Sequence, residues 1–223
     1  MSDPTSSPTL QSIQKLAQVQ NLAIFGAFHP EVTDDGSKKT GTLVLLGPEE
    51  PGFWGGFSSS PEFLDKAPNP LDRWSRRIIS GIAHSVGGDA IFPFGNPPYA
   101  PFIQWAKRSG RAWASPVGLL VHDRAGLFVS YRGAIALESR LSLPEPGTSP
   151  CSFCVLKPCL TACPAAALTG DGYDLGSCHN YLESQAGQNC MQSGCAVRSA
   201  CPVSLTYERK PVQSEFHMKA FHS

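Results

Sequence analysis

The sequence lacks long apolar runs and any excess of one charge. No apolar run approaches the roughly eighteen residues that a membrane-spanning helix needs, so we expect a soluble protein with no membrane partner. The N-terminal residues contain no basic stretch followed by an apolar one, from which we expect no secretory signal and a cytoplasmic location. Lys and Arg together number 18, as do Asp and Glu, and no Lys/Arg-rich run is present, so we expect no nucleic-acid partner.

Cysteine is absent from the first 150 residues, and all eight cysteines lie between positions 151 and 201. The 223 residues, of which 41% are hydrophobic and 16% charged, are enough to bury a core. We therefore expect a globular domain over residues 10–141 and a small cysteine-rich domain over residues 151–203. A Pro-rich connector over residues 142–150 joins them.

Apolar spacing and turn residues predict helices and strands in mixed order before the cysteines. We expect the stretch 52–57 to be a flexible flap or an exposed loop, because it combines glycine with aromatic residues. The strands at 117–122 and 127–137 are expected to pair through a turn at 123–126. The other expected elements are helices over 10–20, from Asn69 to Gly87-Gly88 and over 99–108, strands over 22–28, 42–46 and 89–94, and a turn at 34–36.

The cysteines form two groups of four, and each group ends in a Cys-Pro pair. The first group has the spacing C-x2-C-x4-C-x3-C-P, close to the bacterial ferredoxin run C-x2-C-x2-C-x3-C-P but with two more residues before the third cysteine. A loop with this spacing can wrap an iron-sulfur cube while its backbone N–H groups stabilise the negative charge of the cluster. The groups are Cys151, Cys154, Cys159 and Cys163, then Cys178, Cys190, Cys195 and Cys201.

This pattern predicts two [4Fe-4S] clusters that exchange one ligand. In two-cluster ferredoxins the cysteine before proline ligates the other cluster, because the chain has already turned away into a helix. Each oxidised cluster with four thiolates carries a charge of about −2, so the loaded protein would carry about −4 despite its neutral sequence. We assign one cluster to Cys151, Cys154, Cys159 and Cys201, and the other to Cys163, Cys178, Cys190 and Cys195.

Disulfides and zinc are the alternatives for these cysteines. A disulfide framework is typical of small exported domains, whereas this chain shows no secretory signal and has a sizeable cysteine-free domain. Two four-cysteine zinc sites usually contain paired C-x2-C knuckles, and here only Cys151 and Cys154 form one. His179, beside Cys178, is either a hydrogen-bond donor near the cluster or an exposed residue, since eight cysteines already complete two sets of four.

A family resemblance gives the first domain an expected role. The segment GRAWASPVGLLVH, from Gly110 to His122, and the segment AGLFVSYRGA, from Ala125 to Ala134, resemble a region shared by CblC-type cobalamin-processing proteins and epoxyqueuosine reductases. The order of the cysteines is also similar to that of epoxyqueuosine reductases, and reductive dehalogenases resemble the same arrangement more distantly. His122-Asp123 stands where the family commonly has His-Pro. No residue could be matched to the catalytic carboxylate of the epoxyqueuosine reductases, so the catalytic residues stay unassigned.

The resemblance implies an α+β fold, with a nitroreductase-like α/β sandwich over 10–141 followed by a small bacterial-ferredoxin-like iron-sulfur module. It further implies that the first domain binds cobalamin or another corrinoid, which the two clusters reduce with electrons from a low-potential donor such as a flavodoxin, a ferredoxin or a reductase. The residues matched to the cofactor-facing loop and strand are Trp113, Pro116, Gly118, Leu119, His122, Tyr131, Arg132 and Gly133.

Three other interpretations stay open. Trp113, Tyr131 and His122 could serve only core packing, as buried aromatic and histidine residues often do. The first domain could hold a flavin. The protein could also be a non-catalytic electron carrier whose first domain docks on a partner enzyme, and an absent tetrapyrrole-sized cavity would favour that reading.

Overall fold

The computed structural model describes residues 8–31 and 40–222, and the turn expected at 34–36 lies outside them. The chain divides into two compact units. The first unit consists of the chain up to Gly110 together with Ser130–Pro146. The second unit consists of Arg111–Val129 and the chain from Gly147 onward. The segment 111–129, which we expected in the first domain, therefore belongs to the same unit as the cysteines.

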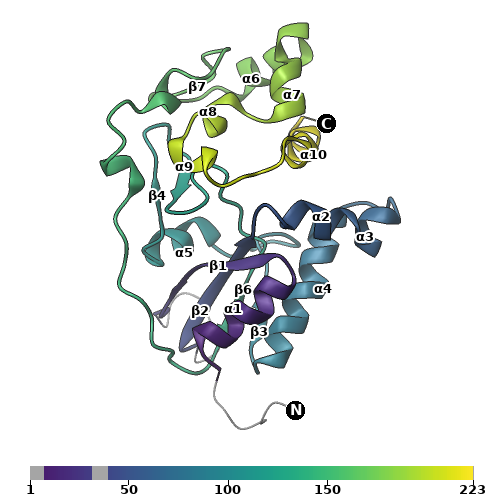
Figure 1. Ribbon diagram of the computed structural model, residues 1–223, viewed down its shortest axis with the longest axis vertical. Coiled ribbons are helices and arrows are strands. Elements are labelled where there is room, and N and C mark those ends of the chain that lie inside the picture. The colour runs from purple at the N-terminus through teal and green to yellow at the C-terminus, as the bar shows by residue number, and fades with distance from the viewer. Residues whose placement is uncertain (1–7, 32–39, 223) are drawn as a thin grey trace. The chain divides into compact units, whose positions relative to one another are not determined.

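The first unit contains a four-stranded antiparallel sheet with the strand order β1-β2-β6-β3. Helices α1 and α4 contact each other, α1 lies against β1, and α4 lies against β3 and β6 (Figure 1). The α+β class is thus confirmed at the level of mixed helices and antiparallel sheets. The elements are α1 (Leu10–Val19), β1 (Leu22–Phe28), β2 (Thr42–Pro48), α2 (Phe53–Ser58), α3 (Pro61–Leu64), α4 (Pro70–Ser85), β3 (Asp89–Ile91), α5 (Phe102–Arg108) and β6 (Gly133–Leu137).

Helices α1 and α4 form where apolar spacing and terminal signals agree. Thr9 caps α1 by accepting a hydrogen bond from the backbone N–H of Ser12 at 3.1 Å, and the Ser12 hydroxyl accepts one from the backbone N–H of Thr9 at 3.0 Å. Pro70 occupies the first turn of α4, where its missing N–H costs nothing. The helix buries Leu71, Trp74, Ile79 and Ile82 along one face, so both predicted helices are confirmed.

Strand β1 was predicted with its observed bounds, but the predicted pairing of 117–122 with 127–137 is wrong. Strand β5 (Leu120–His122) instead pairs with β4 (Ala112–Ala114), while β6 pairs with β2 and β3. A tight turn does form at 123–126, closed by mutual hydrogen bonds of 3.0 Å between the backbones of His122 and Gly126. The turn ends at that bridge, since Leu127 begins no strand and the chain enters the first unit before β6 starts.

The stretch 52–57 is a short helix rather than a flap or an exposed loop. Phe53 and Phe57 of α2 are almost completely buried, and their rings lie 5.4 and 6.0 Å from the ring of Trp74 in α4. The Phe63 ring of α3 lies 5.2 Å from that of Phe57 at a steep angle, as aromatic pairs prefer. Two aromatic residues one helical turn apart therefore make this segment helical, because both rings must reach the same cluster.

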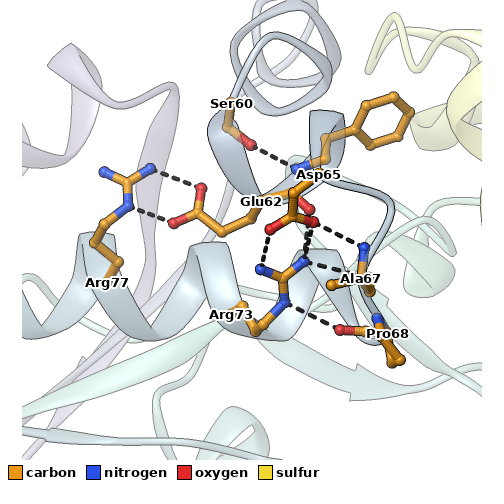
Figure 2. A network of polar contacts seen from close by, with 8 residues as sticks. Ser60, Glu62, Asp65, Ala67, Pro68, Arg73 and Arg77 are labelled. Atoms are coloured by element: carbon orange, nitrogen blue, oxygen red, sulfur yellow. Dashed lines mark hydrogen bonds and ion pairs between the residues drawn. The ribbon is translucent and has the colours of Figure 1, made fainter.

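A polar network joins α3 and the residues that follow it to α4 (Figure 2). Arg77 donates to both carboxylate oxygens of Glu62 at 2.5 and 2.9 Å, and Arg73 donates to both oxygens of Asp65 at 2.7 Å. Arg73 also donates to the backbone carbonyls of Glu62, Ala67 and Pro68. The hydrogen bonds from Arg77 are the main cause that lowers the pKa of Glu62 from 4.5 to about 2.

We expect Glu62→Gln to lower the free energy of unfolding at pH 7 by about 1–2 kcal/mol, since Arg77 is half exposed and solvent weakens the pair. A carboxylate with a lowered pKa in the folded state stabilises the fold above its ordinary pKa, and this contribution disappears as the pH falls from about 4.5 to about 2. Urea unfolding of both proteins at pH 7 and pH 3 checks this. An equal difference at the two pH values would contradict it.

The second unit is made of short elements around the cysteines. Its longest helices are α6 and α10, and α10 lies against α7. Within the described residues, no helix is long and apolar enough to cross a bilayer. The elements are β4 (Ala112–Ala114), β5 (Leu120–His122), η1 (Pro150–Ser152), η2 (Pro158–Leu160), β7 (Leu168–Thr169), β8 (Gly172–Tyr173), α6 (Leu175–Glu183), η3 (Gln185–Gly187), α7 (Gln188–Ser193), α8 (Ala196–Ser199), α9 (Pro202–Leu205) and α10 (Pro211–Phe221).

Candidate iron-sulfur site

Four cysteines from distant parts of the second unit are electrostatic neighbours. Burial raises the pKa of the Cys159 thiol, and the negative charges of Cys151, Cys201 and Cys154 raise it further. Burial also raises the pKa of the Cys151 thiol, and the negative charges of Cys201 and Cys154 raise it further. These thiols therefore lie within electrostatic range of one another. They are the four cysteines that the ferredoxin pattern groups together, and we call them the first set.

The other four cysteines form a second set of neighbours. Burial raises the pKa of the Cys190 thiol, and the charges of Cys195, Cys163 and Cys178 raise it further. Burial also raises the pKa of Cys178, with additional increases from Cys195 and Cys163. Cys163 thus lies with the second set although it ends the first sequence motif, and Cys201 lies with the first set although it ends the second.

All eight cysteines are free thiols. Within the described part of the chain, no three His, Cys, Asp or Glu side chains converge as the ligands of a single metal ion do. In a four-iron cube each cysteine binds a different iron, so the four sulfurs stand further apart than around one ion. Thiolate sulfur is the donor type that such cubes require.

Two polar side chains that no motif indicated lie beside the second set. The Tyr173 hydroxyl, at the end of β8, donates a hydrogen bond of 3.3 Å to Cys178 Sγ. Arg198 of α8 interacts electrostatically with Cys195 and with Tyr173, and it also donates to the backbone carbonyl of Leu127. Both groups would stabilise negative charge on sulfur. The position of Arg198 between two cysteines of the second group was the only sequence signal available.

His179 makes the contacts of a packing residue rather than those of a metal ligand. Its ring stacks on Phe221 with the centroids 4.7 Å apart, and its Nδ1 lies 2.7 Å from Nδ1 of His222. These contacts attach α6 to the end of α10. The polar partner of this histidine is therefore His222, the residue that follows α10.

We expect Tyr173→Phe to lower the reduction potential of an iron-sulfur cluster held by the second set. A hydrogen bond to sulfur favours the more negative reduced state, and losing one of ordinary strength would change the equilibrium constant for reduction by about tenfold. An EPR-monitored redox titration measures the change. Tyr181→Phe is the matched control, because the Tyr181 hydroxyl donates to the carbonyl of Ala186 and to no cysteine. Equal potentials in the wild type and Tyr173→Phe would contradict the prediction.

The segment 111–129 forms one wall of the first set. Val117, Val121 and Leu127 are buried in one apolar cluster with Cys159 and Cys201. The Ser204 hydroxyl, three residues after Cys201, accepts a hydrogen bond of 2.9 Å from the backbone of Leu127. Gly126 has a φ of +55°, and a Cβ there would stand 2.5 Å from the backbone nitrogen of Ser204. Glycine is thus required for the close approach that holds α9 against this wall.

A cavity of about 510 Å³ opens beside the first set. Three side chains at its rim, Phe153, Val155 and Leu156, are 76%, 90% and 89% exposed. Almost all of its other lining is apolar or sulfur, which suits a charged cluster shielded from water. The lining residues are Ser115, Pro116, Val121, Leu127, Pro150, Cys151, Phe153, Cys154, Val155, Leu156, Lys157, Pro158, Cys159, Cys201, Pro202 and Val203.

The residues expected to face a corrinoid divide between the two units. Trp113, Pro116, Gly118, Leu119 and His122 belong to the second unit, and Tyr131, Arg132 and Gly133 belong to the first.

Within the second unit, only Pro116 of these residues lines the cavity. Trp113 and Leu119 pack against the apolar cluster of the first set. Gly118 closes a turn by donating to the carbonyl of Ser115. His122 is fully buried, and its Nδ1 accepts hydrogen bonds from the backbone N–H groups of Arg124 and Ala125. These contacts stabilise the turn at 123–126.

Within the first unit, the three matched residues have packing roles. The Tyr131 ring lies 6.1 Å from that of Phe25 and is mostly buried. Arg132 is buried, donates to Asp72 at 2.6 Å and to Ser75 at 3.1 Å, and burial lowers its pKa. A Cβ on Gly133 would come within 2.8 Å of Ile79, so glycine lets α4 approach β6.

Comparison with protein-family models, curated proteins and solved structures gives no significant match to this chain.

Proposed function

We propose that the second unit holds two [4Fe-4S] clusters and that the protein transfers electrons through them. The supporting observation is the grouping of the eight thiols into two sets of four, with the Cys-Pro cysteine of each sequence group in the other set. This exchange is the ligand arrangement of two-cluster ferredoxins, and we propose a ferredoxin-like organisation for this unit. The clusters would supply one-electron transfer at low potential.

The chain's own residues would tune this process. Backbone and apolar side chains shield the first set, while Tyr173 and Arg198 place a hydrogen bond and a positive charge beside the second. Lys157, the residue whose charge lowers the pKa of Cys151, would offset part of the negative charge of the first. Free thiols of this number are kept available in a reducing compartment, so we also propose the cytoplasm as the place of action.

We further propose that the electron acceptor is cobalamin or another corrinoid, and that the first unit is nitroreductase-like. The resemblance of residues 110–134 to cobalamin-processing proteins suggests this acceptor. The position of Pro116, in the cavity wall beside the first set, is consistent with delivery of electrons from that set. The electron donor would be a low-potential flavodoxin, ferredoxin or reductase.

A carrier without catalytic activity is the second candidate. It is favoured by Phe153, Val155 and Leu156, which expose apolar surface beside the first set. Small apolar contact areas near a redox centre are typical of transient electron-transfer complexes. In this case the cluster would pass its electron to a partner protein directly.

Anaerobic reconstitution with iron and sulfide, followed by titration with hydroxocobalamin, distinguishes the candidates. We expect about eight irons per chain, as two four-iron clusters require. Corrinoid absorbance changes that saturate at one equivalent, with a cobalt EPR signal that disappears on reduction, would support the corrinoid acceptor. Full loading with iron but free cobalamin would leave the carrier as the function. A protein that binds only one metal ion per cysteine set would overturn both candidates.

A further inference from the structure

Ser115 has one polar group without a partner, at the place where β4 ends. Its backbone N–H donates to the carbonyl of Leu119 at 2.8 Å, and its own carbonyl accepts from Gly118 at 2.9 Å. Both backbone groups are therefore used in the turn before β5. Ser115 is 8% exposed, and its hydroxyl is buried without a hydrogen-bond partner among the described residues. Buried hydroxyl groups in folded proteins nearly always have a partner, so the absence of one calls for an explanation.

The surroundings of Ser115 limit what this partner is. Ser115 lines the cavity that also contains all four cysteines of the first set. The remaining lining consists of apolar side chains and Lys157, whose ammonium group is a donor and cannot accept a hydrogen bond. Among the side chains that line the cavity besides Ser115 itself, only those of the cysteines offer an acceptor atom, which is sulfur.

We infer that the Ser115 hydroxyl donates a hydrogen bond to a sulfur atom, inorganic sulfide or cysteine thiolate, of the iron-sulfur cluster held by the first set. This inference rests on the proposed function. Such a bond withdraws negative charge from the cluster and stabilises its reduced, more negative state, because hydrogen bonds to sulfur are among the features that set cluster potentials. Ser115 is then a positioning and tuning residue contributed by the segment 111–129, outside the cysteine motifs.

The experiment compares wild type, Ser115→Ala and Ser115→Thr after reconstitution, by iron analysis and EPR-monitored redox titration of both clusters. We expect Ser115→Ala to keep both clusters and to lower the potential of the first one only. Losing one ordinary hydrogen bond corresponds to about a tenfold change in the reduction equilibrium, or 59 mV for a one-electron couple. Ser115→Thr retains a hydroxyl and should stay near the wild type. Thr206→Val, which removes an exposed hydroxyl from the same unit, is the matched control.

The outcomes separate the inference from the proposed function. A wild type without clusters overturns both. A wild type with two clusters and an unchanged potential in Ser115→Ala overturns the inference alone. If Ser115→Ala fails to load, pulsed ENDOR of the wild-type first cluster in H2O and D2O decides. An exchangeable proton coupled as strongly as a hydroxyl hydrogen-bonded to sulfur, and retained in Ser115→Thr, supports the inference, and its absence overturns it.

Discussion

Cys163→Ala should retain about four of about eight irons, and the cluster that remains should be the one ligated by Cys151, Cys154, Cys159 and Cys201. The reason is spatial, because Cys163 is a neighbour of Cys178 and Cys190 although it follows Cys159 by only four residues. Iron and sulfide analysis gives the loss. The EPR spectrum of the reduced protein identifies the surviving cluster, since Tyr173→Phe should no longer affect it.

Cys201→Ala is the matched variant with the opposite result. It should lose the cluster of the first set and keep the one beside Tyr173, so that Tyr173→Phe still shifts the remaining potential. Each single variant thus controls for the folding of the other, because both must retain four irons. If Cys163→Ala instead lost the cluster of its own sequence group, the ligands would follow the order of the chain and the exchanged assignment would be wrong.

The helices and strands that could be predicted are those whose signals are local. The bounds of β1 follow from a run of apolar residues between a helix end and a proline, and α4 follows from Pro70, its apolar face and two glycines. The pairing of β5 could not be predicted in this way. Strand β5 pairs with β4, which precedes it, although the segment 127–137 was an equally good local candidate for its hairpin partner. The observed pairing depends on the burial of Val121 and Leu127 beside the cysteines, which the local sequence does not show.

The helix at 52–57 also could not be predicted from the local sequence. Two glycines suggested motion, but Phe53 and Phe57 are one turn apart, and Trp74 and Phe63 supply the rings they pack against. Those partners lie up to about twenty residues away and in a different helix. Composition alone therefore favoured a loop, while the aromatic cluster favours a helix.

Only those residues of the candidate site that follow a sequence spacing, the cysteines, could be predicted. The exchanged cysteine sets follow from the Cys-Pro pairs, and the neighbouring thiols agree with that grouping. Tyr173 was not predictable, because a hydroxyl has no motif and reaches a sulfur atom only through the fold. The residues expected to face a corrinoid were taken from the family resemblance, and they include Arg132, whose hydrogen bonds in the structure are with Asp72 and Ser75 of α4.

Asp72→Asn should destabilise the first unit by about 3 kcal/mol, because it leaves the buried guanidinium of Arg132 without its counter-ion. The Arg132→Met change should cost less, since the Asp72 side chain is 38% exposed and can be hydrated once its partner is gone. The double variant should be close to Arg132→Met alone, as expected for two coupled charges. Urea unfolding of the four proteins measures the coupling.

Asp65→Asn is the matched control, because it also removes a carboxylate bonded to an arginine of α4, but at an exposed position, and its effect should be much smaller. Additive effects of Asp72→Asn and Arg132→Met would show that the two side chains are not coupled. The same variants test the corrinoid role of Arg132. If Arg132 serves the fold alone, Arg132→Met that remains folded should bind hydroxocobalamin as the wild type does, whereas weaker binding at unchanged stability would make Arg132 a contact of the cofactor.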